Sequence, residues 1–296
     1  MADENEPGEI AIAGDGLSAA ISPLGAELRI LRDAAGRDLL WDGDPAVWSG
    51  RSPLLFPIVG GLAGGRYRLD GQNYELPRHG FARRRRFALL EQAPAAATFR
   101  LEADEETRAA YPFAFRLDMR YAIAAATIRL EATVANLGDT AMPASFGFHP
   151  ALRWPLPYGA PRADHRIRFG ANEPTPIRRL DTAGLVDPRL RPSPIAGDTL
   201  ALDDDLFVED AIILDRPASR SLLYGAAAGP QLRIDYPDMP MLGLWSKPGA
   251  GFLCIEPWQG FADPAGFDAD LFAKPGIVII PPAGRRTFAM SITLLP

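Results

Sequence analysis

The sequence predicts an all-β protein, built as a large antiparallel β-sandwich with few short helices. Apolar residues recur at every second position in several segments, and helical periodicity is scarce. The 29 prolines and 28 glycines are spread through the chain and indicate many short connections. No alternation of strands and helices indicates a parallel sheet. We expect the 296 residues to form a single domain, because sandwiches routinely exceed 200 residues.

Half-buried strands are expected where apolar and polar side chains alternate. Residues 9–22 read EIAIAGDGLSAAIS, which predicts a strand, a glycine-rich turn and a second strand. Segments 115–123, 127–138 and 286–295 show the same alternation over longer stretches. The side chains expected to face the core in these segments are Phe115, Leu117, Met119, Tyr121, Ile128, Leu130, Ala132, Val134, Phe288, Met290, Ile292 and Leu294.

Turn residues predict how these strands connect. Asp70-Gly71 lies between two alternating segments and predicts a tight hairpin, and a second hairpin signal runs from Pro281 to Gly284. The segment 104–113 could form one short helical turn that ends at Pro112. Residues 155–194 contain several prolines and little periodicity, which indicates a long surface excursion and no domain linker.

The composition excludes several classes of protein. A formal net charge of -6 and a pI near 5.2 argue against bulk nucleic-acid binding. The acidic start lacks the apolar core of a signal peptide, so we expect residues 1–8 to be a disordered lead-in. No apolar run is long enough to predict a membrane span. The single cysteine, Cys254, excludes an internal disulfide and favours a reducing, cytoplasmic location. We expect a monomer or homodimer.

The three histidines do not predict a metal site. His79, His149 and His165 lack metal-ligand spacing, and one cysteine cannot form a thiolate cluster. No dinucleotide-binding or phosphate-binding glycine loop and no GxSxG nucleophile motif is present. No metal is therefore expected, and His165, in the predicted excursion, is assigned no role.

Two ionisable residues lie in apolar segments. His149 follows Phe148 in SFGFHPAL, and Glu256 lies in LCIEPWQGFADP. A histidine in such surroundings is either a structural donor to a carbonyl or a proton carrier. A buried glutamate needs a partner, so Glu256 is either paired with an arginine or held as a general base beside Trp258. An aromatic wall beside polar groups also suits a sugar.

A basic run, Arg83 to Arg86, interrupts the acidic composition. It is either a solvated basic face or a site that binds a sugar phosphate through guanidinium groups. At strand periodicity only half of these side chains could line one site. His79 precedes Gly80, which permits an unusual backbone conformation or the close approach of a ligand.

Four motifs, taken in order, resemble one known family. RSPLLFPIVGGL, PRHGFAR, SFGFHPAL and CIEPWQGFAD are similar to motifs of the aldose 1-epimerase (galactose mutarotase-like) superfamily, especially its LacX-like and glucose-6-phosphate 1-epimerase branch. The resemblance covers the chain from about the first hairpin to the last strand. It implies a large antiparallel β-sandwich with an open sugar-binding cleft and no metal or organic cofactor. It also implies that the partner is a small-molecule sugar or sugar phosphate.

The resemblance also implies roles for individual residues. His149 matches the catalytic acid of the family and Glu256 its catalytic base. The residues that match substrate-binding positions are His79, Arg51, Arg83 and Asp210. The aspartate assignment stays open, because Asp203, Asp204 and Asp205 lie close to Asp210 in the sequence.

The function implied is interconversion of the α and β anomers of a hexose or hexose-6-phosphate. A base takes the proton of the anomeric hydroxyl while an acid protonates the ring oxygen, which opens the ring. Glycoside hydrolysis is disfavoured, because it usually needs two carboxylates and the motifs supply one carboxylate and one histidine. A non-catalytic carbohydrate-binding or sensing protein on the same fold remains an alternative.

Overall fold

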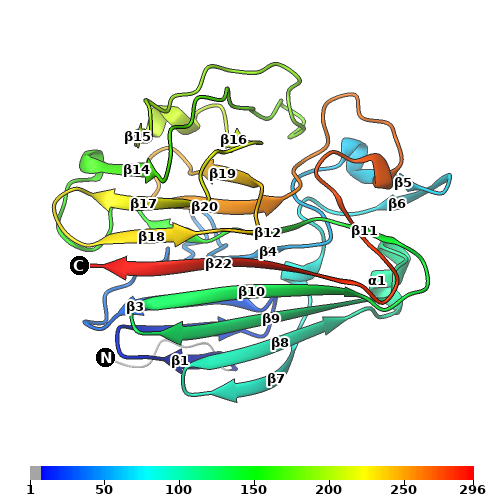
Figure 1. Cartoon of the computed structure of the whole chain (residues 1–296), viewed down its shortest axis with the longest axis horizontal. Helices are drawn as coiled ribbons and strands as arrows, with labels where there is room; N and C mark the ends of the chain where they lie inside the picture. Colours follow the sequence, from blue (N-terminus) through cyan, green and yellow to red (C-terminus); the bar gives the residue numbers. More distant parts are fainter. Residues whose placement is uncertain (1–7) are drawn as a thin grey trace.

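The computed structural model describes residues 8–296, and its architecture is an antiparallel β-sandwich. Its two largest sheets have nine and six strands, and every pair of neighbouring strands is antiparallel, as in the register of β10 with β9 and with β22. In Figure 1 the long strands β22, β10 and β9 run side by side across the molecule. The predicted fold class is confirmed. Apart from Gly8, the predicted lead-in, residues 1–8, lies outside the described residues.

The nine-stranded sheet runs in the order β15-β14-β17-β18-β22-β10-β9-β8-β7. Its strands are β7 (Ala88–Ala93), β8 (Ala96–Glu102), β9 (Phe115–Ala124), β10 (Thr127–Asn136), β14 (His165–Phe169), β15 (Thr199–Ala201), β17 (Ser221–Ala226), β18 (Gln231–Asp235) and β22 (Arg285–Leu295). The alternation predicted for β9, β10 and β22 is confirmed, because their inward residues are buried or, for Leu294, partly buried.

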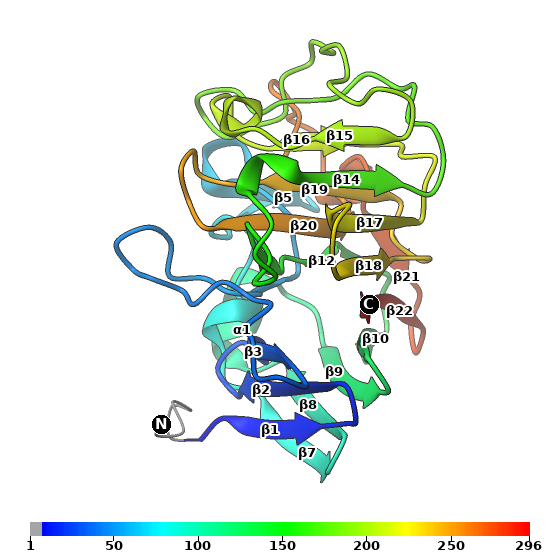
Figure 2. The ribbon, with the colours of Figure 1, turned by 90° about the vertical axis from the view of Figure 1, so that its left-hand side faces the viewer.

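The six-stranded sheet carries the residues that matter most below. Its main path is β16-β19-β20-β12-β4, and β13 also pairs with β20. The strands are β4 (Leu54–Leu55), β12 (Phe146–Phe148), β13 (Ala151–Arg153), β16 (Ile212–Leu214), β19 (Met241–Trp245) and β20 (Phe252–Gln259). In both Figure 1 and Figure 2, β19 and β20 lie alongside β14 and β17.

Smaller elements complete the molecule. The remaining strands are β1 (Ile10–Ala13), β2 (Leu17–Ser22), β3 (Glu27–Asp33), β5 (Arg66–Leu69), β6 (Gln72–Glu75), β11 (Met142–Ala144) and β21 (Val278–Ile280). The helices are α1 (Glu105–Ala110) and the short 3-10 helices η1 (Ala63–Gly65), η2 (Ala82–Arg84), η3 (Arg162–Asp164), η4 (Asp204–Phe207) and η5 (Leu271–Ala273). No helix within residues 8–296 has the length and apolar character that crossing a membrane requires.

The predicted local elements near the first strands and hairpins are also confirmed. β1 and β2 pair across the glycine-rich turn, and β5 and β6 pair across Asp70-Gly71. Both turn residues have positive φ, 49° and 80°, as the tight hairpin requires. The short helix α1 begins after Asp104, whose side chain accepts the Thr107 N–H, and ends before Pro112.

β20 is buried along its whole length, because both of its faces are covered. Leu253 and Ile255 point toward the main core between the two large sheets. Cys254 and Trp258 point to the opposite face and pack in two smaller apolar clusters. Because side chains alternate along a strand, Glu256 shares this second face. The apolar run that surrounds Glu256 in the sequence is therefore a strand buried on both sides.

Three sequence predictions need correction. The excursion 155–194 contains β14, which lies inside the nine-stranded sheet with Ile167 buried, so this stretch is only partly a surface loop. The turn from Pro281 to Gly284 forms, but it connects β21 to β22 in different sheets and is not a hairpin. The arginine run does not follow strand periodicity, because Ala82–Arg84 form the 3-10 helix η2.

Candidate active site

A cavity of about 200 Å³ lies on the second face of the six-stranded sheet. Its floor comes from side chains of β16, β19 and β20, and its walls come from loops that are far apart in the sequence. The lining residues used below are Trp48, Arg78, His79, Arg83, His149, Asp210, Trp245, Glu256 and Trp258. The structure thus gathers four segments that the sequence analysis singled out separately.

The strand register brings His149 and Glu256 together. Gly147 of β12 pairs with Trp258, and Ala151 of β13 pairs with Cys254, both on β20. His149 and Glu256 lie midway between these two pairs and are therefore opposite each other. Residues directly opposite in an antiparallel pair point to the same face. Contact between the two side chains therefore follows from the register.

The hydrogen-bond ladder along β20 is interrupted at this position, so His149 lies between two strands and belongs to neither. β12 ends at Phe148 and β13 begins at Ala151, since Pro150 has no N–H to donate to the ladder. The carbonyl of Pro150 still accepts the Ile255 N–H at 3.2 Å. His149 is therefore held in place by β20 on both sides of the break.

Glycines on the neighbouring strands make room for the cavity wall. A Cβ added at Gly243 of β19 would lie 2.4 Å from the Trp258 ring, and one at Gly147 would lie 2.7 Å from it. These contacts are shorter than real Cβ contacts, so the Trp258 indole occupies space that only glycine leaves open. Gly243 also pairs with Glu256, which places a residue without a side chain beside the carboxylate.

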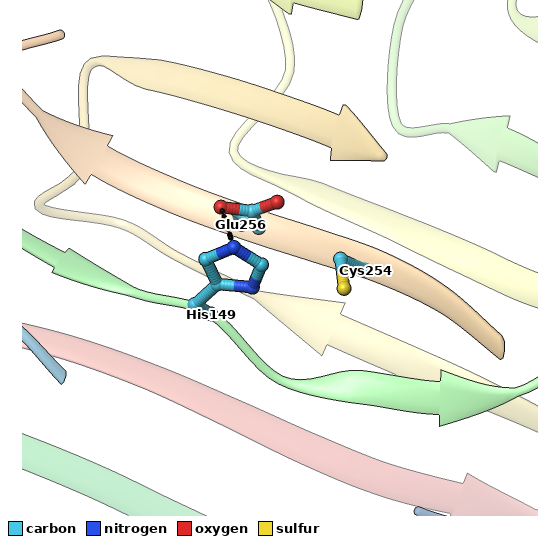
Figure 3. Close-up of side chains that lie close together, drawn as sticks. All are labelled: His149, Cys254 and Glu256. Carbon is cyan, nitrogen blue, oxygen red and sulfur yellow. Dashed lines mark ion pairs between the residues drawn. The ribbon is translucent and has the colours of Figure 1, made fainter. Parts of the chain in front are cut away.

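His149 and Glu256 form a buried pair, shown in Figure 3. The distance from His149 Nε2 to Glu256 Oε2 is 3.1 Å, and the two residues are 7% and 2% exposed. Burial raises the pKa of the Glu256 carboxyl well above its usual range; the indole of Trp258 opposes this rise, and Asp210 adds to it. Trp258 Nε1 lies near the carboxylate without completing a hydrogen bond. Burial lowers the pKa of His149 to about 3.

Aromatic rings hold the imidazole of His149 in position. Trp48 stacks on it with ring centroids 5.2 Å apart and an interplanar angle of 29°. Trp245 meets it edge-on at 6.0 Å, and Trp48 in turn meets Trp245 edge-on at 5.4 Å. The other ring nitrogen, Nδ1, makes no hydrogen bond to another residue in the described part of the chain, although the backbone of His149 itself opposes the fall in its pKa.

His79 lies beside His149, with ring centroids 5.8 Å apart. Its Nδ1 accepts the Gly60 N–H at 3.1 Å, so in the neutral ring the hydrogen is on Nε2. Burial, followed by the charges of His149, Arg83 and Arg78, lowers the pKa of His79 well below its usual range. His79 is therefore a neutral donor with a fixed tautomer.

Backbone conformation fixes the position of His79. Both His79 and Gly80 have positive φ, 67° and 69°. A Cβ at Gly80 would lie 2.2 Å from the Phe56 carbonyl oxygen, so the close approach that the glycine permits is to the protein backbone. This segment also pairs with the chain around Phe56 through an isolated bridge between Phe56 and Gly80.

The arginine run divides between two environments. Arg83 lines the cavity and donates to the carbonyl of Arg78, at 3.0 Å, while Arg85 turns away and pairs with Asp104 and Glu106. Arg84 is exposed. The 3-10 helix η2 thus directs one member of the run to the cavity, where it joins Arg78.

Asp210 lines the cavity, and Asp203, Asp204 and Asp205 do not. It has a positive φ of 63° and accepts the Ala211 N–H at 2.7 Å. Asp203 caps η4, and Asp204 pairs with Arg162 at 2.6 Å. The geometry therefore favours Asp210 among the aspartates that the sequence left open.

Arg51 does not reach this cavity. Its guanidinium donates to the Arg29 carbonyl at 3.0 Å, and its backbone N–H donates to Glu27 at 2.8 Å. The Arg51 side chain also packs against Gly43, so closely that a Cβ added to this glycine would contact it. These hydrogen bonds give Arg51 a structural role, because they hold its segment against the segment of Glu27 and Arg29. We therefore do not include Arg51 in the site.

Several cavity residues were not found from the sequence. Trp48 and Trp245 gave no signal that separated them from core aromatics, and Arg78 was overlooked beside the more conspicuous run Arg83 to Arg86. Gly184 also lines the cavity, and a Cβ there would lie 1.8 Å from Arg78 Nη2. Part of the supposed surface excursion therefore covers the site.

His165, which was assigned no role, lies in the core and not on the surface. Its Nε2 accepts the Leu156 N–H at 2.9 Å, and its Nδ1 lies 3.0 Å from the Pro161 carbonyl. Both ring nitrogens therefore serve local structure, away from the residues that line the cavity.

Comparisons with known proteins agree with this architecture. A family profile described as aldose 1-epimerase matches residues 9–267. The chain is 33% identical over 296 residues to the protein LacX, chromosomal, of Lactococcus lactis subsp. lactis, with 97% of this chain and 99% of that protein covered.

Two solved structures share the fold over nearly the whole chain. A galactose mutarotase related enzyme from Lactobacillus acidophilus superposes with a TM-score of 0.89 at 28% identity, covering 97% of both chains. A galactose mutarotase-like protein from Lactobacillus casei superposes with a TM-score of 0.90 at 27% identity, covering 97% of this chain and 100% of that one. The resemblance carried by the four motifs is confirmed, and the chain belongs to the aldose 1-epimerase family.

Proposed function

We propose that the protein is an isomerase that interconverts the α and β anomers of a hexose or hexose-6-phosphate. The observation that supports this most is the buried His149–Glu256 pair, 3.1 Å apart, in a cavity with a second histidine and an aromatic wall. The anomeric hydroxyl and the ring oxygen are bonded to the same carbon atom. An acid and a base that act on both must therefore lie close together, as these two side chains do.

The reaction needs one proton on the pair. In ring opening, the Glu256 carboxylate takes the proton of the anomeric hydroxyl and the His149 imidazolium protonates the ring oxygen, so the C1–O5 bond breaks. Rotation about C1–C2 presents the other face of the aldehyde. His149 then takes the proton back from the C5 hydroxyl and Glu256 returns its proton to the carbonyl oxygen. Each group is regenerated, so no cofactor is consumed.

Burial favours a protonated Glu256 with a neutral His149, which is the form of the pair that is present when the sugar ring is open. The raised pKa of Glu256 and the lowered pKa of His149 leave the proton of the empty pair on the carboxyl. Moving it to Nε2 gives the imidazolium and carboxylate that attack the cyclic sugar, without any exchange with solvent. The two forms have the same net charge, so a cavity that excludes water can host both steps.

The other lining residues suit a sugar ligand. His79 offers a neutral Nε2–H donor, and Asp210 offers a carboxylate acceptor for a hydroxyl group. Trp48, Trp245 and Trp258 provide apolar faces for the C–H groups of the ring. Arg78 and Arg83 are two cations at the same cavity, which favours a phosphorylated substrate among the hexoses.

Polarimetry tests this proposal. Freshly dissolved α-glucose and glucose-6-phosphate are followed with and without protein, and we expect faster decay of optical rotation with at least one sugar. His149→Asn should lower turnover by about 10² to 10⁴, the typical value of a positioned acid. Tight sugar binding without acceleration would instead support the non-catalytic carbohydrate-binding alternative. The cytoplasmic location and the monomeric or homodimeric state stay predictions.

A further inference from the structure

We propose that His149, Cys254 and Glu256 form an inhibitory binding site for a thiophilic divalent cation such as Zn²⁺ or Cd²⁺. The three residues offer an imidazole nitrogen, a thiol sulfur and a carboxylate oxygen that all lie within 4.8 Å of one another. Metal binding does not depend on the proposed function, whereas the predicted inhibition of turnover rests on it.

The strand register explains why the three ligands converge. Cys254 and Glu256 are two residues apart on β20, so both side chains project from the same face. Cys254 pairs with Ala151, two residues beyond His149, so Ala151 contributes only a methyl group beside the sulfur. Figure 3 shows the three side chains grouped on one side of the strand, with the ring edge that carries the second nitrogen facing Cys254.

The contact between His149 and Glu256 is the second observation that points to a ligand. Nε2 lies 3.1 Å from Glu256 Oε2, and the two residues are 7% and 2% exposed. Two ligand atoms on one tetrahedral zinc ion lie about 3.3 Å apart, because each bond is about 2.0 to 2.1 Å long. A cation between Nε2 and the carboxylate would therefore take the place of the proton that the two side chains share.

The spacing is close to what a transition metal requires. Three atoms within 4.8 Å of one another lie no more than about 2.8 Å from a common point, whereas zinc ligands lie at about 2.0 to 2.3 Å. Side-chain shifts of roughly 0.5 Å to 0.8 Å would therefore close the site. Three protein ligands leave a fourth position for water or an incoming hydroxyl group.

Charge neutrality favours a dication at this depth. Cys254 and Glu256 are 0% and 2% exposed, and isolated negative charges are unfavourable at such buried positions. A divalent cation with one thiolate, one carboxylate and one neutral imidazole has no net charge. On binding, the thiol and, where protonated, the carboxyl release their protons to water, and no oxidation or reduction is involved.

The cation would stop the proton transfer that turnover needs. It would occupy Nε2 of His149 and one carboxylate oxygen of Glu256, so His149 could not carry the proton and Glu256 could not accept the sugar proton. Trp48 and Trp245 pack against the apolar cluster that contains Cys254 and also line the cavity, and both are partly exposed. Movement of one of these indoles would open a path for the ion.

Titration of the purified protein with Co²⁺ and Cd²⁺ tests the site. Because Cys254 is the only cysteine, any thiolate-to-metal charge-transfer absorption reports this residue alone. We expect saturation at one ion per chain in the folded protein, no band in Cys254→Ala, and affinity at least about tenfold weaker in His149→Asn and in Glu256→Gln. Absence of the band from folded wild-type protein would overturn the proposal, whatever the variants do.

His79→Asn is the matched control, since it removes the neighbouring cavity histidine and asparagine tolerates its positive φ. This variant should keep the charge-transfer band with unchanged affinity. If His149→Asn and Glu256→Gln both left the band unchanged, Cys254 would bind the metal without these two residues, and the proposed three-residue site would be wrong. If the protein turns over sugar, Zn²⁺ should inhibit the turnover, and a chelator should restore it. Cys254→Ala should remain active and should not be inhibited by the ion.

Discussion

His149 lies opposite Glu256 across an interrupted pair of strands, and both residues are held by the same strand, β20. The hydrogen bonds on either side of the interruption fix this position: Gly147 pairs with Trp258, and Ala151 pairs with Cys254. The 3.1 Å contact between the imidazole and the carboxylate is therefore set by backbone geometry as well as by side-chain packing. Any displacement of β20 carries both members of the pair together.

Glu256→Gln should nearly abolish turnover while leaving the fold intact. Glutamine keeps the size of the side chain and resembles the protonated carboxyl that burial favours, so the free energy of unfolding should change little. Loss of the base should lower kcat by about 10² to 10⁴. Polarimetry measures the rate, and thermal unfolding of the same sample checks the fold. Full activity in this variant would remove Glu256 from the mechanism.

The dependence of kcat/KM on pH should show no acid limb near 6.5. Burial lowers the pKa of His149 to about 3, so the pair gains a second proton only in strong acid. It loses its single proton only above the usual range of a carboxyl, because the pKa of Glu256 is raised. Since kcat/KM reports the free enzyme, activity should not fall on the acid side until the pH approaches 3, and it should fall on the alkaline side when Glu256 loses its proton.

Spontaneous mutarotation also varies with pH, so each rate must be corrected for the reaction without protein. An acid limb with its midpoint at the ordinary histidine value of about 6.5 would contradict a singly protonated pair with a neutral His149.

Arg83→Ala should weaken the binding of a hexose-6-phosphate and change little for the free hexose. Arg83 lines the cavity, and a hydrogen bond to a charged group contributes about 1.5 to 3 kcal/mol. KM for the phosphorylated sugar should therefore rise at least about tenfold. Arg84→Ala is the matched control, because the neighbouring Arg84 is exposed and outside the cavity lining. Equal effects of Arg83→Ala on both sugars would exclude a phosphate-binding role.

Trp48→Ala should lower kcat by about tenfold through loss of the ring that stacks on His149. The indole stacks on the imidazole at 5.2 Å with an interplanar angle of 29°, where it both orients the ring and stabilises its protonated form by roughly 1 kcal/mol. Trp48→Phe keeps a ring in this place and should recover most of the rate. If both variants changed KM alone, Trp48 would be a substrate-binding residue that does not position His149.

Gly243→Ala should destabilise the protein by about 1 to 3 kcal/mol, because its new Cβ would lie 2.4 Å from the Trp258 ring. The double variant Gly243→Ala/Trp258→Phe makes room for the methyl group and should recover part of this loss. Chemical denaturation of the three variants and the wild type measures the coupling between the two sites. Additive effects would show that Gly243 is not required to seat Trp258.

The strands could be predicted well because the signal is local. Alternation in β9, β10 and β22 depends only on neighbouring residues, and so does the Asp70-Gly71 turn. Residues 155–194 were misjudged because β14 is short and lies between irregular segments, so its period is too brief to recognise. The Pro281–Gly284 turn was identified, but a turn alone does not state whether its strands share a sheet.

The site could be predicted only in part, for the same reason. His149 and Glu256 were identified by unusual neighbours, and their contact depends on a register between segments about a hundred residues apart, which no local pattern encodes. Arg51 was included by resemblance, although its hydrogen bonds hold it among Arg29 and Glu27. Arg78 was missed because its place in the cavity is set by contact with Gly184, in a distant loop.

The cavity has two kinds of wall, and they differ in how freely they can change. His149 and Glu256, the side chains proposed to transfer protons, are tied to central strands, whereas Trp48, Gly184 and Asp210 come from three separate connections around the rim. Insertions or replacements in these connections would reshape what enters without moving the reacting pair. Exchange of a single rim segment between relatives is thus a direct route to altered sugar preference with the chemistry conserved.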